Sequence, residues 1–150
     1  MEVITKSAQE TQKLGEKVGC DLKRGFSQTG GRIIALYGEL GSGKTTFVQG
    51  LARGLEIKRR IISPTFVFVR QYSIIAHQSS TIIFYHIDLY RIKKTEETQG
   101  LGLEEILADK KAFVAIEWAE KIKNILPKKR IDIYFKYLNR RKRKIVIVAA

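Results

Sequence analysis

The sequence is poor in cysteine and proline and has no long apolar run. Its 150 residues include one cysteine and two prolines, so an internal disulfide or a thiolate zinc site cannot form. No apolar run approaches the roughly 20 residues that a membrane-spanning helix needs. The first residues lack the basic-then-apolar layout of a secretory signal. These absences exclude disulfide scaffolds, metal ribbons and membrane proteins, and we expect a soluble, cytoplasmic protein with no membrane partner.

Acidic residues are scarce beside basic ones. The chain has 28 Lys and Arg against 15 Asp and Glu, a formal net charge of +13. Eleven of the basic residues lie between Lys121 and Lys144, a stretch that contains a single acid, Asp132. A concentrated basic region attracts polyanions and makes their binding salt-dependent. Region 121–144 is therefore a candidate RNA contact, and a solvated basic surface is the alternative.

The apolar pattern predicts one α/β domain over residues 1–150. Short apolar runs indicate buried strands at residues 32–37, 81–87 and 112–116. Apolar residues at helical spacing predict helices over residues 8 to about 23 and 44–55. The remaining expectations are loops at 25–31 and 73–80, extended chain at 61–62 and 66–69, two short helices within 96–107, and a closing hairpin of 131–138 with 144–148.

A glycine-rich turn carries the strongest chemical signal. Residues 38–45 are Gly-Glu-Leu-Gly-Ser-Gly-Lys-Thr, which fits G-x-x-x-x-G-K-[ST] between a predicted strand and a predicted helix. Glycine permits the positive φ angles that turn backbone amides toward one anion, and the helix N-terminus adds partial positive charge. In such a P-loop, Lys44 reaches the β- and γ-phosphates and Thr45 coordinates Mg²⁺. The predicted nucleotide-binding residues of this segment are Gly38, Glu39, Leu40, Gly41, Ser42, Gly43, Lys44, Thr45 and Thr46.

Two acids follow predicted buried strands. Asp88 comes after the strand at 81–87, and Glu117 comes after the strand at 112–116. The carboxyl ends of neighbouring parallel strands face one crevice, so both carboxylates are expected near Thr45 and the γ-phosphate. Either acid alone would more often be a helix cap or a loop ion pair. The side chains next to these acids either support the site or only complete the strand and its packing: His86, Tyr90, Arg91 and Trp118.

Four motifs follow one another along the chain: Gly38-Glu-Leu-Gly-Ser-Gly-Lys-Thr-Thr46, Ser63-Pro-Thr-Phe66, His86-Ile-Asp-Leu-Tyr-Arg91 and Ile116-Glu-Trp118. In this order and spacing, over residues 7 to 138, they resemble the TsaE family, the bacterial P-loop ATPases of tRNA threonylcarbamoyladenosine biosynthesis. The resemblance implies a single-domain P-loop NTPase fold with a mixed, mostly parallel sheet, flanking helices and a C-terminal β-hairpin. It also implies a Mg²⁺-dependent ATPase whose hydrolysis of ATP resets a complex with TsaB and TsaD. In that setting, region 121–144 is a candidate tRNA contact.

The resemblance also assigns roles to individual residues. Lys44 would hold phosphates and assist catalysis, and Asp88 would serve hydrolysis. Thr45 and Glu117 would ligate magnesium, while Thr11 matches a family position near the nucleotide base. Ser63 and Thr65 belong to a segment that resembles a switch loop facing the γ-phosphate. The chain departs from the common pattern at Glu39 and Ser42, and neither change should alter phosphate binding.

Two other functions remain open from the sequence. A small-molecule P-loop kinase would need an acceptor pocket and usually an arginine-bearing lid, for which Arg91 is the best-placed residue. A non-enzymatic RNA-binding module built on the basic hairpin would leave the P-loop unexplained.

Overall fold

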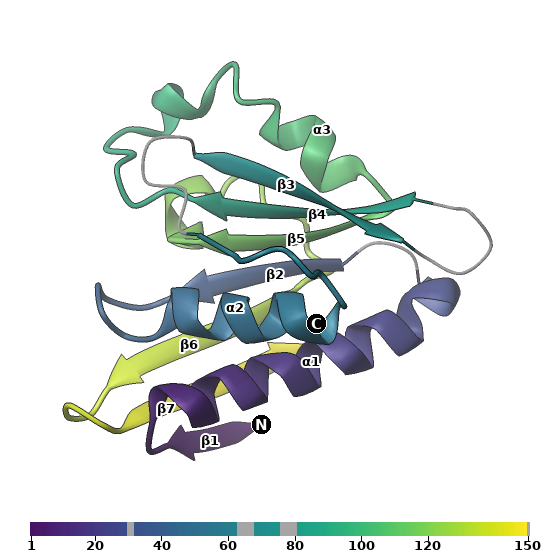
Figure 1. The fold of residues 1–150 in the computed structure, drawn as a ribbon. Helices are drawn as coiled ribbons and strands as arrows, with labels where there is room; N and C mark the ends of the chain where they lie inside the picture. Colours follow the sequence, from purple (N-terminus) through teal and green to yellow (C-terminus); the bar gives the residue numbers. More distant parts are fainter. Residues whose placement is uncertain (30–31, 63–67, 76–80, 150) are drawn as a thin grey trace.

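A seven-stranded sheet forms the centre of the molecule, with strand order β1-β7-β6-β2-β5-β4-β3 (Figure 1). The computed structural model describes residues 1–29, 32–62, 68–75 and 81–149. Its strands are β1 (Glu2–Thr5), β2 (Arg32–Tyr37), β3 (Val69–Ile75), β4 (Thr81–Asp88), β5 (Ala112–Glu117), β6 (Ile131–Tyr137) and β7 (Arg143–Ala149). Its helices are α1 (Ala8–Thr29), α2 (Lys44–Gly54) and α3 (Leu103–Ala108), with short 3₁₀ helices η1 (Thr95–Thr98) and η2 (Ala119–Ile122). Within these ranges, no helix combines the length and apolar character needed to cross a membrane.

The sheet is mixed, with a parallel centre and antiparallel edges. Strand β2 pairs in parallel with both β5 and β6, and β4 pairs in parallel with β5. Strands β3, β7 and β1 are added through antiparallel pairings, and β6 with β7 forms the predicted hairpin. The prediction of a single-domain α/β fold with a mixed sheet flanked by helices is confirmed.

Each face of the sheet has its own hydrophobic core. Helices α1 and α2 lie against one face (Figure 1), where Phe47 and Leu51 are fully buried among strand residues. On the other face, α3 and η2 contribute Leu103 and Ile122 to a second cluster. Every residue of β5 is buried, which explains its continuous apolar sequence because a strand covered on both faces has no solvent side.

Glycines bring the backbones of α1 and α2 into direct contact. A Cβ atom added at Gly50 would lie 1.9 Å from the backbone oxygen of Gln12, and one at Gly54 would lie 2.1 Å from that of Glu16. The same holds from the other helix, since a Cβ at Gly15 would lie 2.2 Å from the backbone oxygen of Phe47. This contact fixes α2 along its length, and α2 begins at the predicted P-loop.

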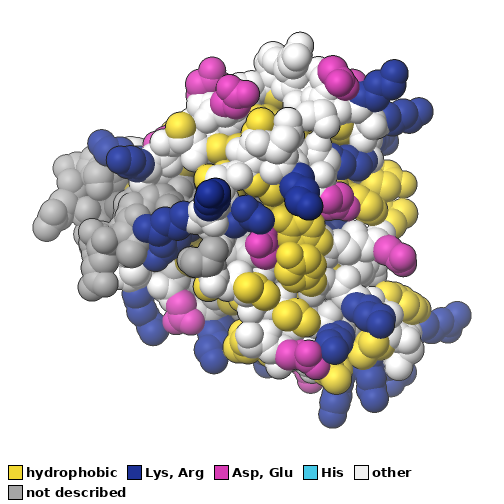
Figure 2. Space-filling view, turned by 180° about the vertical axis from the view of Figure 1, so that it is seen from behind, with side chains coloured by type: hydrophobic (Ala, Val, Ile, Leu, Met, Phe, Trp, Pro, Cys, Tyr) yellow, Lys and Arg dark blue, Asp and Glu magenta, His cyan; other side chains and the backbone are white. Residues whose placement is uncertain are grey.

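The face turned away from α1 and α2 carries a band of hydrophobic side chains with Lys and Arg grouped around it (Figure 2). On this face the rings of Tyr37 and Tyr134 stack with centroids 4.8 Å apart. The Tyr37 hydroxyl donates to Asp132 Oδ1 at 2.9 Å, and Arg130 Nε donates to the same oxygen at 2.7 Å. Burial, followed by the hydrogen bond to Asp132, raises the pKa of Tyr37 to about 12.

Three sequence expectations about secondary structure were wrong or incomplete. Helix α1 continues to Thr29 instead of ending near residue 23, so the loop expected from residue 25 was wrong at its start. Gly25 was taken as a helix end, whereas a single glycine is tolerated inside a helix at a cost of about 1 kcal/mol. Strand β3 extends through Ile75, where residues 73–75 were expected in a loop, because pairing with β4 continues to that point. Strand β1 was not predicted, since four residues are too few for a pattern. The extended segment expected at 66–69 lies partly outside the described residues.

Candidate functional site

A cleft of about 740 Å³ opens where α2 begins, beside the carboxyl ends of β4 and β5. The predicted residues that line it are Thr11, Leu40, Gly41, Gly43, Lys44, Thr45, Thr46, Asp88, Tyr90, Arg91, Glu117 and Trp118. Residues not predicted for the site also line it, namely Lys6, Ser7 and Ala8 at the start of α1, and Arg140, Arg141 and Arg143 in the β6–β7 hairpin. The structure therefore gathers most of the predicted residues in one cavity.

The glycines of the P-loop adopt the backbone angles that the motif requires. Gly38, Gly41 and Gly43 have φ of 149°, 76° and 103°, in the range that L side chains rarely adopt. A Cβ at Gly38 would also lie 2.7 Å from both the Phe135 backbone oxygen and Ser42 Oγ. The loop leads directly into α2, whose free N-terminal amides favour an anion.

Lys44 lies inside the loop with its ammonium group on backbone carbonyls. Its Nζ donates to the oxygens of Gly38 at 2.5 Å and Glu39 at 2.8 Å, and it lies 4.4 Å from the centre of the Trp118 ring. Burial lowers the pKa of Lys44, and the nearby carboxylate of Glu117 is the largest opposing influence. Glu39 contributes its carbonyl to this arrangement, and its exposed carboxylate is a weaker influence that also opposes the lowering of the Lys44 pKa.

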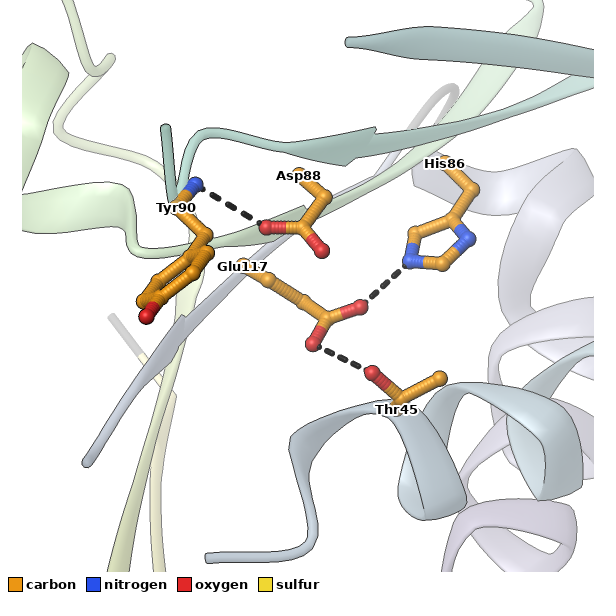
Figure 3. Close-up of polar contacts among 5 residues, drawn as sticks. All are labelled: Thr45, His86, Asp88, Tyr90 and Glu117. Carbon is orange, nitrogen blue, oxygen red and sulfur yellow. Dashed lines mark hydrogen bonds and ion pairs between the residues drawn. The ribbon is translucent and has the colours of Figure 1, made fainter. Parts of the chain in front are cut away.

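The two predicted acids end neighbouring parallel strands, and they are direct partners in the strand register (Figure 3). Glu117 is 2% exposed, and its Oε1 accepts from Thr45 Oγ1 at 2.8 Å. Its second oxygen, Oε2, accepts from Nε2 of fully buried His86 at 2.6 Å. Asp88 Oδ1 accepts from the Tyr90 backbone amide at 3.0 Å. Glu117 therefore joins the first turn of α2 to β4, with His86 behind it and outside the cleft lining.

The other predicted residues lie at the cleft, in a buried contact with β1, or outside the described residues. Trp118 adopts a left-handed backbone conformation with φ of 60°, and its ring centroid lies 5.3 Å from that of Tyr90 at the cleft. Thr11 is buried, and its hydroxyl lies 2.8 Å from the hydroxyl of Thr5 in β1. Ser63 and Thr65 lie outside the described residues. The hairpin arginines were seen in the sequence only as part of a basic region, because nothing local indicates that the hairpin reaches the P-loop.

The donor atoms near the P-loop suit a magnesium ion bound together with phosphates. Among the described residues, no group of three or more His, Cys, Asp or Glu side chains could hold a metal ion alone. The side-chain oxygens of Thr45, Asp88 and Glu117 lie in the cleft beside the loop. Mg²⁺ is usually held by one or two carboxylates and completed by substrate phosphates and water, so this all-oxygen set fits Mg²⁺ bound with a nucleotide.

Comparison with known proteins identifies relatives over most of the chain. The family model described as "Threonylcarbamoyl adenosine biosynthesis protein TsaE" matches residues 5–145. The tRNA threonylcarbamoyladenosine biosynthesis protein TsaE of Treponema pallidum is 35% identical over 147 residues, which are 98% of this chain and 99% of that protein. TsaE of Bacillus subtilis is 36% identical over 119 residues, 79% of this chain and 70% of that protein.

A solved structure agrees with these sequence matches. A crystal structure of Bacillus subtilis YdiB has a TM-score of 0.74 and 28% sequence identity, and the match covers 99% of this chain and 84% of that one. The motif resemblance, the family match and the shared fold lead to one assignment. The chain belongs to the TsaE family of tRNA threonylcarbamoyladenosine biosynthesis proteins.

Proposed function

We propose that this chain is a Mg²⁺-dependent ATPase that serves tRNA threonylcarbamoyladenosine biosynthesis. One observation carries the proposal: Lys44 and Thr45, at the start of α2, lie in the same cleft as Asp88 and Glu117, which end two adjacent parallel strands. A P-loop alone supports phosphate binding. Carboxylates at the carboxyl ends of neighbouring strands add groups that can hold a cation and orient water.

The P-loop and Lys44 bind the triphosphate. Amides around Gly41 and Gly43 surround the phosphates, and the Lys44 ammonium moves from the carbonyls of Gly38 and Glu39 to the phosphate oxygens. Once the triphosphate is bound, the amides and Lys44 are in place, so they stabilise the charge that develops on the transferred phosphoryl group without further reorganisation.

Thr45 and Glu117 hold magnesium beside the phosphates. Bound Mg²⁺ supplies neutralisation of the β- and γ-phosphate charge. Thr45 Oγ1 lies 2.8 Å from Glu117 Oε1, so both oxygens are close enough to bind one ion. His86 fixes the carboxylate through the opposite oxygen of Glu117, as partners of metal ligands commonly do.

Asp88 orients the water that attacks the γ-phosphate. One of its oxygens accepts from the Tyr90 amide, which fixes the direction of the carboxylate at the cleft. Water attacks phosphorus, the bond to the β-phosphate oxygen breaks, and Asp88 takes the proton that the water loses. The products are ADP and inorganic phosphate.

The ATPase acts with the threonylcarbamoyl-transferase pair TsaB and TsaD. The pathway is given by the family to which the chain belongs, and the resemblance of the four motifs implies this pair as partners. Hydrolysis resets the complex between rounds of transfer, so we expect slow turnover by the chain alone and faster turnover in the complex.

The test measures phosphate release from Mg-ATP by the purified chain, alone and with TsaB and TsaD from the same source. Lys44→Ala should lose both ATP binding and turnover, whereas Lys17→Ala removes an equal charge from an exposed position on α1 and should change neither. Unchanged ATP affinity in Lys44→Ala would refute the nucleotide site. Turnover that ignores the pair would refute these partners, and transfer of labelled phosphate to a hydroxyl acceptor would indicate a kinase instead.

A further inference from the structure

One wall of the cleft is not used by the phosphate chemistry proposed above. It is formed by two turns that are far apart in the sequence, the turn between β1 and α1 and the turn between β6 and β7. The second turn contributes Arg140 and Arg141 to the lining, and the first residue of β7 contributes Arg143. These three cations belong to region 121–144, which the sequence alone offered as a tRNA contact.

The β6–β7 turn has a defined shape. Asn139 Oδ1 accepts from the backbone amides of Arg141 at 2.9 Å and Lys142 at 2.8 Å. The guanidinium of Arg143 donates to the Asn139 carbonyl at 2.6 Å, and its Cζ lies 4.4 Å from the centre of the Tyr137 ring. Arg143 is therefore engaged within the hairpin, and the turn presents Arg140 and Arg141 from a fixed backbone.

This turn lies against the P-loop. A Cβ added at Gly43 would lie 3.7 Å from Thr11 Cγ2 and 3.9 Å from Arg143 Cγ. One side of the loop is thus flanked by the start of α1 and the hairpin, whereas Asp88 and Glu117 lie at the ends of β4 and β5. If the terminal phosphate faces those carboxylates, the ribose and base extend toward the hairpin wall.

Arg140 and Arg141 are exposed side chains that line this wall. Within residues 1–29, 32–62, 68–75 and 81–149, neither guanidinium forms a hydrogen bond or ion pair. A guanidinium is planar, weakly hydrated and always charged, and it stacks on aromatic rings. These properties match the flat face of a nucleotide base.

We infer that Arg140 and Arg141 close over the nucleoside half of the bound nucleotide and stack on its base. The inference rests on the proposed function, because it takes the ligand of the cleft to be a nucleoside triphosphate. It assigns the end of the basic region nearest the P-loop to the nucleotide. The base is then held from a surface hairpin, while the phosphates are held by the P-loop.

The experiment compares Mg-ATP with Mg-tripolyphosphate, which has the phosphates but no nucleoside. Dissociation constants are measured by calorimetry for the wild-type chain, for Arg140→Ala/Arg141→Ala, and for Lys128→Ala/Lys129→Ala. The control pair removes the same charge from exposed positions of the same basic region, outside the cleft lining. Loss of the stacking contacts should weaken ATP binding about tenfold and leave tripolyphosphate binding unchanged, and the control should change neither.

Other outcomes of this experiment distinguish a wrong stacking inference from a wrong proposed function. Equal weakening for ATP and tripolyphosphate, or ATP affinity unchanged from wild type, would overturn the inference. Arg140→Lys/Arg141→Lys keeps the charge and removes the planar group, so full ATP affinity in that variant would also overturn it. Unchanged tripolyphosphate binding shows that each variant is folded. Failure of the wild-type chain to bind Mg-ATP would instead refute the proposed function.

Discussion

Replacing Gly50 by alanine tests the closest contact in the fold. Gly50 lies in α2 where that helix meets α1, and an added Cβ would lie 1.9 Å from the backbone oxygen of Gln12, 2.7 Å from its carbonyl carbon and 2.9 Å from its Cα. Real Cβ contacts stay beyond about 3.0 Å. Because all three atoms belong to the backbone, no side-chain rotation can relieve the overlap, and the two helices must separate.

The expected magnitude follows from two opposing effects. Alanine favours helix over glycine by about 0.8–1 kcal/mol. Overpacking typically costs about 1–3 kcal/mol and occasionally more, and a rigid backbone contact belongs at the upper end of that range. We expect a net loss of about 2 kcal/mol in the free energy of unfolding, or a fall in Tm of roughly 4–8 °C for a domain of this size.

The assay is thermal and urea unfolding followed by circular dichroism, with Gly25→Ala as the matched control. Gly25 lies in the other helix, and a Cβ there would have its nearest neighbour at 3.9 Å, on the side chain of Arg32. That variant should gain stability of about 0.5–1 kcal/mol from helix propensity. If Gly50→Ala were as stable as Gly25→Ala, the close approach of α1 and α2 would be wrong.

Three further predictions concern the site and the face of the sheet turned away from α1 and α2. Glu117→Gln should raise the Mg²⁺ concentration needed for ATP binding at least tenfold or so, and an unchanged Mg²⁺ titration would remove Glu117 from the metal site. His86→Leu deprives Glu117 Oε2 of its partner and should shift the same titration by roughly tenfold, with metal-free nucleotide affinity unchanged as the check on folding. Tyr37 has its pKa raised from 10.0 to about 12, so the folded chain retains a proton that the unfolded chain loses, and the stability it contributes is complete below pH 10 and lost as the pH rises toward 12. Tyr37→Phe should abolish this pH dependence in urea unfolding, and identical slopes for both proteins would contradict the assigned pKa.

Much of the site follows from short stretches of sequence. The shape of the glycine-rich loop could be predicted because it depends on consecutive residues, with glycines where φ is positive and Lys44 and Thr45 at the first turn of a helix. The strands β4 and β5 could be predicted from apolar runs, and the acids that end them from position alone. That Asp88 and Glu117 lie side by side could not be derived from the sequence, because it depends on β4 and β5 being neighbours in the sheet.

Pairings between distant segments decided the rest. Strand β1 is a strand because it pairs with the edge strand β7. This pairing joins the two ends of the chain, and the sequence of four residues does not indicate it. The His86 contact depends on strand register, which places its side chain behind Glu117.

The sequence by itself determined the glycine-rich loop before α2, the buried strands and the family. Only the tertiary structure decided that the basic hairpin forms a wall of the cleft and that glycines allow α1 and α2 to touch. The physical reason is the distance along the chain over which each feature is specified. Neighbouring residues specify backbone angles and the apolar face of an element, whereas strand order and helix packing specify which distant residues meet.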